Sequence, residues 1–390
     1  TPMPKHRGIE RFVAGCRNIL AERSPLMLAC SLVIVVAATV GATRLNVDTM
    51  TLKYLPSDHP VVADHEAIET AWGPYNVLEF VVHPAEGKTL NDADLLAAMG
   101  RFVDKAVDDP RIHKGLSLDT VYRAFLPDAQ PGTPLTQEQI ALLSWGEDKL
   151  NLVWEPEKQG FRNNAMAAFR TSDASLGRIK LVGSMLSARE LSALQADMDA
   201  LGQQTMGDLG TIEASGYLPL YTRIIDYVMT SQIRSFLLAM ALIFGIMLLG
   251  LRSLRLALIS LIPNVFPVTV MFAVMGFAGI DLDIGTASIA AIVLGVSIDD
   301  TIHFLWSWRH AERNGMGWHD ALAYTLDHAG RPAIITTVLL VCGYSVLMAG
   351  SGATVFYFGL LTTVAAVAAL FADLIILPLL LKPFTRPVTS

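Results

Sequence analysis

The chain has 390 residues, of which 52% are hydrophobic and only 17% are charged, and its mean hydropathy is +0.45. These values exceed those of ordinary water-soluble globular proteins and indicate a membrane protein. Residues 44–234 carry 17 Lys and Arg against 26 Asp and Glu, and the rest of the chain carries 12 against 10. An acidic soluble domain therefore interrupts a slightly basic membrane part, and no basic patch indicates a nucleic-acid partner.

The first 24 residues are polar and basic, and we predict that they form a cytoplasmic leader. They show no signal peptide with a small-residue cleavage site, and the chain begins at Thr1, so we expect a further part of the protein upstream. The cysteines are Cys16, Cys30 and Cys342, all outside the acidic stretch, so a packed core rather than disulfides must stabilise that domain.

Six stretches are apolar and long enough to cross a bilayer as helices, at roughly 17 to 27 residues each. One of them precedes the acidic domain, predicted at residues 44–233, and five follow it as a bundle over residues 234–381, with a tail at 382–390. The predicted spans are residues 25–43, 235–251, 256–279, 284–306, 332–349 and 355–381.

The distribution of Lys and Arg predicts how the spans are oriented, because cytoplasmic loops are enriched in both. The leader, the loops after the second and fourth spans, and the tail all contain Lys or Arg. The two short loops on the other side, residues 280–283 and 350–354, contain none. We therefore predict a multi-pass protein with both termini in the cytoplasm and the acidic domain outside.

Inside the acidic domain the pattern becomes alternating and amphipathic, which predicts strands and helices in turn. This alternation favours a ferredoxin-like α+β unit, and the Pro-rich residues 126–140 are predicted to be an insertion between its halves. No metal-ligand spacing, phosphate loop or nucleophile motif occurs there, so we expect no catalytic residue, metal or cofactor. The predicted strands are residues 77–83, 165–171, 177–185 and 211–217, and the predicted helices are residues 91–109, capped by Asn91, and 187–205.

The fourth span ends in the string SIDDTIHF, which brings Asp299, Asp300 and His303 into an apolar helix. His303 shares a helix face with each acid, at i+4 and i+3. An ionised carboxylate within the bilayer costs about 2.5 to 3.5 kcal/mol even on the mildest scale. The acids must therefore take up protons or meet a cation or a water-filled cavity, and both remedies predict a site that exchanges protons.

Two structural alternatives compete with this proton relay. The carboxylates could simply hydrogen-bond neighbouring helices and hold the bundle together, or the cluster could lie at the cytoplasmic interface, since two tryptophans and an arginine follow it. Two adjacent acids are a costly way to do what Ser or Thr does, and apolar residues still surround the cluster. We therefore favour the relay.

Other polar residues of the spans are candidates for the relay or for a gate. Asp373 in the sixth span either joins the relay or makes a packing hydrogen bond, and the sequence leaves these two interpretations equal. Thr336 and Thr337 in the fifth span are possible relay or gate residues, although the sequence favours hydrogen bonds to their own i−4 carbonyls over a role with protons.

The third span contains the string LIPNVFP, with Pro263, Asn264 and Pro267. The prolines interrupt the helical hydrogen-bond ladder and predict a kink. This kink is a possible gate, or it only shapes the helix.

The strings SLRLALISLIPNVFPV, LDIGTASIAAIVLGVSIDDTIHF and FGLLTTVAAVAALFADLIILPLLL resemble the resistance-nodulation-division superfamily, in its MMPL-like and hopanoid-transporter-like branch of lipid exporters. The last five spans also resemble the sterol-sensing-domain arrangement of Patched-type proteins. The resemblance implies proton-driven export of lipids or other hydrophobic molecules from a bacterial inner membrane, with a periplasmic domain, protons as the coupling ion and no enzymatic activity. By position, the relay falls on Asp299 and Asp300, with His303 adjacent.

Transporters of this superfamily join two such halves, and this chain has one, most similar to the second. The resemblance therefore implies a second half as partner, from the same precursor or as a homodimer. This second half would also have to supply any cationic or tyrosine partner for the acids, because the predicted spans of this chain contain no Lys or Arg. A non-transporting lipid or sterol-sensing scaffold and a SecD/SecF-like translocation accessory stay open as alternatives. An intramembrane aspartyl protease pairing Asp299 with Asp373 is remote, because no GxGD string occurs.

Overall fold

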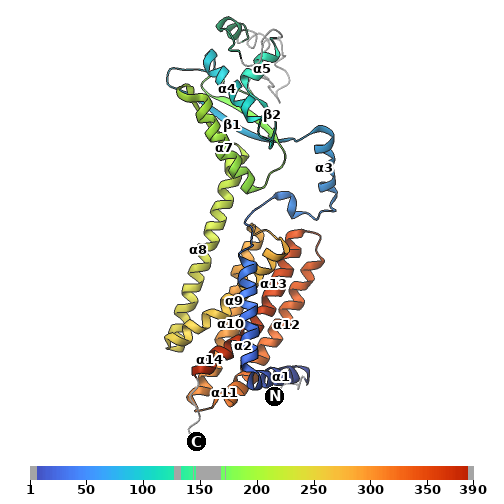
Figure 1. Cartoon of the computed structure of the whole chain (residues 1–390), viewed down its shortest axis with the longest axis vertical. Coiled ribbons are helices and arrows are strands. Elements are labelled where there is room, and N and C mark those ends of the chain that lie inside the picture. The colour runs from blue at the N-terminus through green and yellow to red at the C-terminus, as the bar shows by residue number, and fades with distance from the viewer. Residues whose placement is uncertain (1–6, 127–132, 144, 146–167, 172, 385–390) are drawn as a thin grey trace, which may run out of the picture. The chain divides into compact units, whose positions relative to one another are not determined.

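The computed structural model describes residues 7–126, 133–143, 145, 168–171 and 173–384. The chain divides into two compact units, which we describe separately. A helical unit comprises Thr1–Ser57 with Tyr227–Ser390, and a sheet unit comprises Asp58–Asp226. Figure 1 labels the elements of both.

The sheet unit contains one four-stranded antiparallel sheet in the order β2-β3-β1-β4. Its strands are β1 (Asn76–Pro84), β2 (Ile112–Leu116), β3 (Gly177–Gly183) and β4 (Gly210–Ser215). Its helical elements are α3 (Pro60–Trp72), α4 (Ala93–Ala106), α5 (Leu118–Ala124), α7 (Ala188–Met206) and the 3₁₀ turn η2 (Gly207–Leu209).

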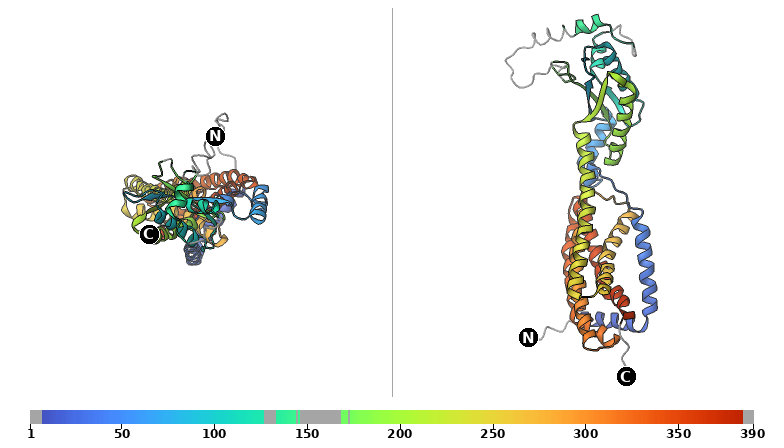
Figure 2. Two further views of the ribbon diagram at one scale, coloured as in Figure 1. Left: turned by 90° about the horizontal axis from the view of Figure 1, so that it is seen from above. Right: turned by 90° about the vertical axis from the view of Figure 1, so that its left-hand side faces the viewer.

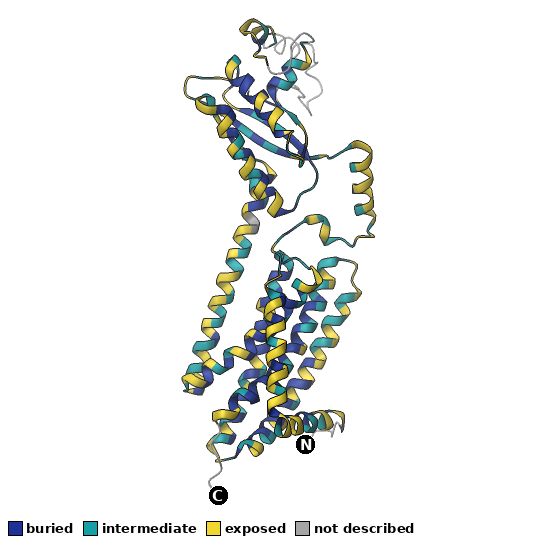
Figure 3. Cartoon of the chain, viewed as in Figure 1, coloured by how far each residue is buried: buried dark blue, intermediate teal, exposed yellow. Residues whose placement is uncertain are grey.

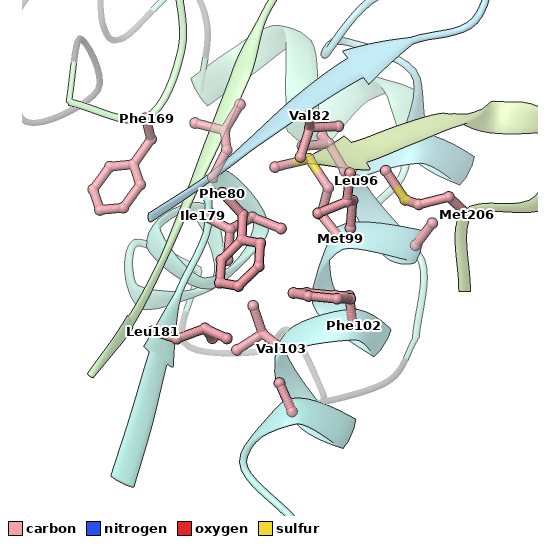
Figure 4. Close-up of a cluster of buried hydrophobic side chains, with 14 of the residues drawn as sticks. Phe80, Val82, Leu96, Met99, Phe102, Val103, Phe169, Ile179, Leu181 and Met206 are labelled. Atoms are coloured by element: carbon pink, nitrogen blue, oxygen red, sulfur yellow. The ribbon is translucent and has the colours of Figure 1, made fainter. Parts of the chain in front are cut away.

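The core of this unit follows from the alternation in β1, where Leu78, Phe80 and Val82 are buried. Successive side chains of a strand point to opposite faces, so these three share the face that the helices cover. Phe80 meets Phe102 of α4 edge to face, with ring centroids 5.9 Å apart, as Figure 4 shows. Full burial of each such side chain stabilises the fold by about 1.5 to 3 kcal/mol.

Three of the four predicted strands and both predicted helices of the acidic domain are present, with two corrections. The cap position of α4 is Asp92, not Asn91, because the backbone is still extended at Asp92. The Asp92 carboxylate makes no capping bond to the helix and instead accepts from the Thr89 amide. The strand predicted at 165–171 is wrong in its described part: the chain turns there, and only an isolated bridge joins Arg170 to Gly177. Residues 165–167 lie outside the described residues, as do 127–132 of the predicted insertion.

The helical unit contains the apolar helices. Among the described residues, six helices are long and apolar enough to cross a membrane, and each overlaps a predicted span. These spans are Ser24–Ala42 (α2), Tyr217–Leu251 (α8), Leu254–Ala278 (α9), Ile284–Arg313 (α10), Trp318–Ala349 (α11, Trp318–Thr325; η3, Leu326–Gly330; α12, Arg331–Ser345; η4, Val346–Ala349) and Ala353–Phe384 (α13, Ala353–Phe371; η5, Ala372–Ile376; α14, Leu377–Leu381; η6, Lys382–Phe384).

The predicted leader contains a helix that the sequence analysis did not identify, α1 (Arg7–Glu22). Val13, Cys16 and Leu20 recur at helical spacing and are buried against the bundle, whereas Phe12 and Ile19 are exposed. In both side views α1 lies across one end of the bundle (Figures 1 and 2). Its amphipathic pattern is typical of a helix at a membrane surface.

Helix α2 is attached to the rest of the helical unit at both ends. At one end, Lys382 donates from Nζ to Ser24 Oγ at 2.7 Å. Beyond the other end, Asn46 donates from Nδ2 to Asp281 Oδ1 at 2.8 Å, and its carbonyl accepts from the Leu282 amide at 2.7 Å. Between these ends α2 packs on α9, and many of its apolar residues are exposed, so that much of its ribbon is yellow in Figure 3.

Candidate functional site

The polar cluster of α10 divides between two faces of the helix. Asp299 and His303 point out of the bundle, with side chains 75% and 71% exposed, and Asp299 Oδ1 lies 3.6 Å from His303 Nε2. The i+4 spacing predicted from the sequence thus brings these two together. Asp300, the next residue, is half-buried.

The inward face of α10 carries Thr301, which is fully buried. Its hydroxyl donates to Asp373 Oδ1 at 2.6 Å, across 72 residues of sequence. The Thr301 hydroxyl also lies 3.2 Å from the Ser297 carbonyl one turn earlier, so the bond to the carboxylate is the shorter one. Asp373 is itself only 2% exposed, and this hydroxyl is its one hydrogen-bond donor among the described residues.

Asp373 lies in a π-helical turn, η5, within the sixth span. A second π turn, η3, lies in the fifth span. Each turn ends two residues before a proline, Pro378 and Pro332 respectively. Proline has no N–H and its ring displaces the carbonyl four residues earlier, so the helix widens locally. Such π turns are frequent at functional sites.

Asp300 faces the fifth span. Its carboxylate lies near the Thr336 hydroxyl of α12 and in the same region of the bundle as Asp373. Thr336 donates to the Ala333 carbonyl at 3.0 Å, three residues back rather than the four predicted, and Thr337 is buried. The structure thus brings Asp300, Thr336 and Asp373 into one neighbourhood, in which Thr301, the residue after Asp300, hydrogen-bonds Asp373.

Pro263, Asn264 and Pro267 of α9 are buried, but no hydrogen bond of the described residues links them to the acids. Pro263 and Pro267 both lie inside one continuous helix. Asn264 is fully buried and donates from Nδ2 to the Ser260 carbonyl at 2.7 Å. Its Oδ1 has no hydrogen-bond partner in the described part of the chain. A role as gate stays a prediction for these three residues.

Sequence reasoning missed Thr301, which joins the two acidic helices. The signal available was its place directly after Asp300 and four residues after Ser297, on the face opposite Asp299. Within the described residues, no group of three or more His, Cys, Asp or Glu side chains could hold a metal ion. The side chains around Asp373 thus offer a second carboxyl group and hydroxyl groups, which can donate and accept hydrogen bonds.

Comparison with known proteins relates the chain to a family and to a distant relative. A model of the MMPL family matches residues 53–383. The chain is also 25% identical, over 347 residues, to the protein named "Putative membrane protein MJ1562" of Methanocaldococcus jannaschii. That alignment covers 84% of this chain and 82% of the relative.

Proposed function

Since this chain belongs to the MMPL family, a family of multi-pass membrane transporters rather than enzymes, we propose that it is one half of a proton-driven exporter of lipids or other hydrophobic molecules. One observation carries the proposal: a fully buried carboxylate, Asp373, is hydrogen-bonded to Thr301 of a second span, in the same region of the bundle as another acid, Asp300. The predicted spans around them contain no Lys or Arg to neutralise these acids permanently.

Protons supply the missing positive charge in this proposal. Asp300 and Asp373 alternate between protonated and ionised forms, and each change alters the repulsion between them and the bond that Thr301 donates. Because these contacts join α10, α12 and η5, a proton gained or lost changes how three helices pack. One proton crossing 100 mV releases about 2.3 kcal/mol, enough to shift a two-state equilibrium roughly fiftyfold.

The exposed pair Asp299 and His303 supports a partner for this half. Charged groups in a membrane span rarely face lipid and almost always face protein or water, yet both side chains point out of the bundle. We propose that a second half, from the same precursor or from a second copy, covers this face and completes the relay.

The sheet unit belongs to the part of the chain between the first and second spans, which we propose lies in the periplasm of a bacterial inner membrane, with both termini cytoplasmic. The strand order β2-β3-β1-β4, with α4 between β1 and β2 and α7 between β3 and β4, supports a ferredoxin-like module. In the proposed function, the sheet unit opens and closes a path for the hydrophobic substrate when the spans rearrange.

The test uses proteoliposomes loaded with a pH-sensitive dye and containing a fluorescent phospholipid as probe. An imposed pH gradient should move the phospholipid between leaflets, measured with a membrane-impermeant quencher, while protons enter. Asp300→Asn or Asp299→Asn should abolish both signals without lowering expression. Full activity in both variants would end the proposal. Saturable lipid binding without any dependence on the gradient would instead favour a sensing scaffold with sterol-sensing-like helices, and copurification with a translocation channel would favour a SecD/SecF-like accessory.

A further inference from the structure

Helix α1 has one side that the other described residues leave largely uncovered. Gly8, Phe12, Gly15 and Ile19 of α1 and Arg23 directly after it follow one another at intervals of three or four residues, so they share this side. We call it the open side. Phe12 is 52% exposed and Ile19 is 44% exposed. A Cβ atom added at Gly8 or Gly15 would meet no described atom within 4 Å. Two large apolar side chains therefore lie on a surface with open space beside them.

Positive charge surrounds the open side. From Arg11 to Arg23 the chain carries three arginines, all exposed, and one acid, Glu22. Arg11 directly precedes Phe12, and the Arg23 amide donates to the Ile19 carbonyl at 2.8 Å, which places Arg23 one helical turn after Ile19. An apolar surface with an arginine at each end is complementary to anionic lipid headgroups above an acyl boundary.

The open side also continues the apolar surface of the first span. Helix α2 begins at Ser24, directly after Arg23, and its Leu26 and Leu28 are exposed. Helix α1 lies across one end of the bundle (Figures 1 and 2), and the distribution of Lys and Arg predicts that this end is cytoplasmic. Cytoplasmic leaflets carry anionic lipids, which attract basic segments beside a span. The place of α1 in the fold therefore favours the bilayer surface as the partner of its open side.

The opposite side of α1 is connected to both π turns. Val13, Cys16 and Leu20 belong to one buried cluster with Ala329 of η3 and Leu374 of η5, and α1 contacts both turns. Helix α1 has only 16 residues, two of them glycines, and an isolated helix of this kind is marginal in water. A ligand that stabilises α1 from its open side should therefore also stabilise the contacts on its buried side.

We infer that the open side of α1 binds anionic phospholipid headgroups of the leaflet at this end, and that this binding holds α1 against η3 and η5. Arg11 and Arg23 contact the phosphates, and Phe12 and Ile19 enter the acyl boundary. Neither part depends on the proposed function, because both concern binding and stability and not transport. The competing occupant is a second half of the transporter, which would cover the open side with protein.

Hydrogen exchange of the full chain in lipid nanodiscs tests the binding. The probes are nanodiscs of phosphatidylcholine alone and of phosphatidylcholine with an equal part of phosphatidylglycerol. The readout is the factor by which the anionic lipid slows exchange of the α1 amides, which we call the lipid response. Arg11→Gln and Arg23→Gln should each lower this response about fivefold, the factor that one arginine near an anionic surface contributes.

Arg17 provides the matched control for these charges. Arg17→Gln removes the same charge from another side of α1, and should lower the lipid response less than Arg11→Gln or Arg23→Gln does. An equal loss in all three variants would overturn the assignment to the open side. The absence of any lipid response in the parent protein would overturn the binding itself.

Gly15 separates lipid binding from helix stability. Gly15→Glu should slow exchange of α1 in neutral nanodiscs, because Glu forms helices better than Gly and has room at this position. The same variant should lose most of the lipid response, because its carboxylate repels the phosphates. Gly15→Gln brings a similar gain in helix stability without the charge, and should keep the response. Equal lipid responses in these two variants would overturn the inference.

The second part of the inference is tested in the same experiment. Anionic lipid should slow exchange of η3 and η5 together with that of α1, and Gly15→Glu should remove all three effects. A lipid response in α1 without any change in the two π turns would overturn the coupling. Slow exchange of α1 that depends on two copies of the chain in one nanodisc, and not on the lipid, would overturn the binding and identify the second half as the occupant.

Discussion

The two units of this chain differ in the partner that they give to a buried acid. In the sheet unit, Asp119 has a side chain only 4% exposed, and Arg123 holds it one helical turn away with Nε 2.7 Å from Oδ2. In the helical unit, Asp373 is as deeply buried, but the described residues give it a neutral threonine hydroxyl instead of a cation. An acid with its own counter-charge is part of a stable fold, whereas an acid without one depends on a proton.

The largest effect should come from removing the acid that lacks a counter-charge. Asp373→Asn keeps the shape and the bond from Thr301, but cannot ionise, so coupled movement of protons and fluorescent phospholipid should fall to background. Asp327→Asn is the control, because Asp327 forms an exposed pair with Arg331 at 2.8 Å and should retain transport. Normal transport by Asp373→Asn would show that Asp373 makes only a packing contact.

Removing the counter-charge of the other acid should instead damage the fold. Arg123→Met leaves Asp119 buried without its ion pair, which should cost about 3 to 5 kcal/mol. Hydrogen exchange in the full chain measures this loss of stability, which should appear as faster exchange of the backbone amides of α4 and α5. Adding Asp119→Leu to Arg123→Met should restore most of the protection, and a double variant as unstable as the single one would contradict the comparison.

The neutral hydrogen bond to Asp373 should matter less for stability. Thr301→Val removes it, at a cost of about 1 to 3 kcal/mol, and should slow transport. Thr301→Ser keeps the hydroxyl and should rescue most of the rate. If valine and serine behave alike, the Thr301 hydroxyl has no part in the relay.

The smallest effect concerns pH in the sheet unit. The hydrogen bond from the Arg111 side chain lowers the pKa of Asp109 below its usual 3.8. The native state therefore binds fewer protons at Asp109 than the unfolded state does. The contribution of Asp109 to the free energy of unfolding is present above pH 3.8 and is lost as pH falls below that value. Burial raises the pKa of Asp119, so the pH dependence that Asp119 gives to the free energy of unfolding has the opposite sign. Its stabilising contribution grows as pH falls.

Hydrogen exchange of the sheet, followed between pH 5 and pH 3 and corrected for intrinsic rates, should show this loss as less than about 1 kcal/mol, as for other partly exposed pairs. Asp109→Asn should make the pH dependence shallower or reverse it. A steeper dependence in that variant would mean that the pKa of Asp109 is not lowered in the native state.

The sequence predicted the secondary structure correctly wherever a hydrophobic pattern repeats over many residues. Apolar runs predicted the six membrane-length helices of the described residues, and the alternation of Leu78, Phe80 and Val82 predicted β1. Helix α1 was missed because its apolar residues are interleaved with charged ones, although Val13, Cys16 and Leu20 recur at helical spacing. A pattern must be tested against the helical period even in a basic segment.

The candidate site was less accessible to sequence reasoning. The acids of α10 are conspicuous, but the bond between Thr301 and Asp373 joins residues 72 positions apart, and no local periodicity records it. The π turn at Asp373 likewise leaves no trace in the hydrophobic pattern. Only the proline two residues after it, Pro378, hinted at a distorted helix.

The attachment of α2 at both its ends has a practical consequence. A span fixed through Ser24 and just beyond its other end through Asn46 serves as a stationary reference, against which displacement of other helices can be measured. The chain already carries exposed thiols for this purpose, Cys30 on α2 and Cys342 on α12, whereas Cys16 is buried. Spin labels on these two native cysteines would allow the distance between α2 and α12, the helix that faces Asp300, to be measured without an engineered residue.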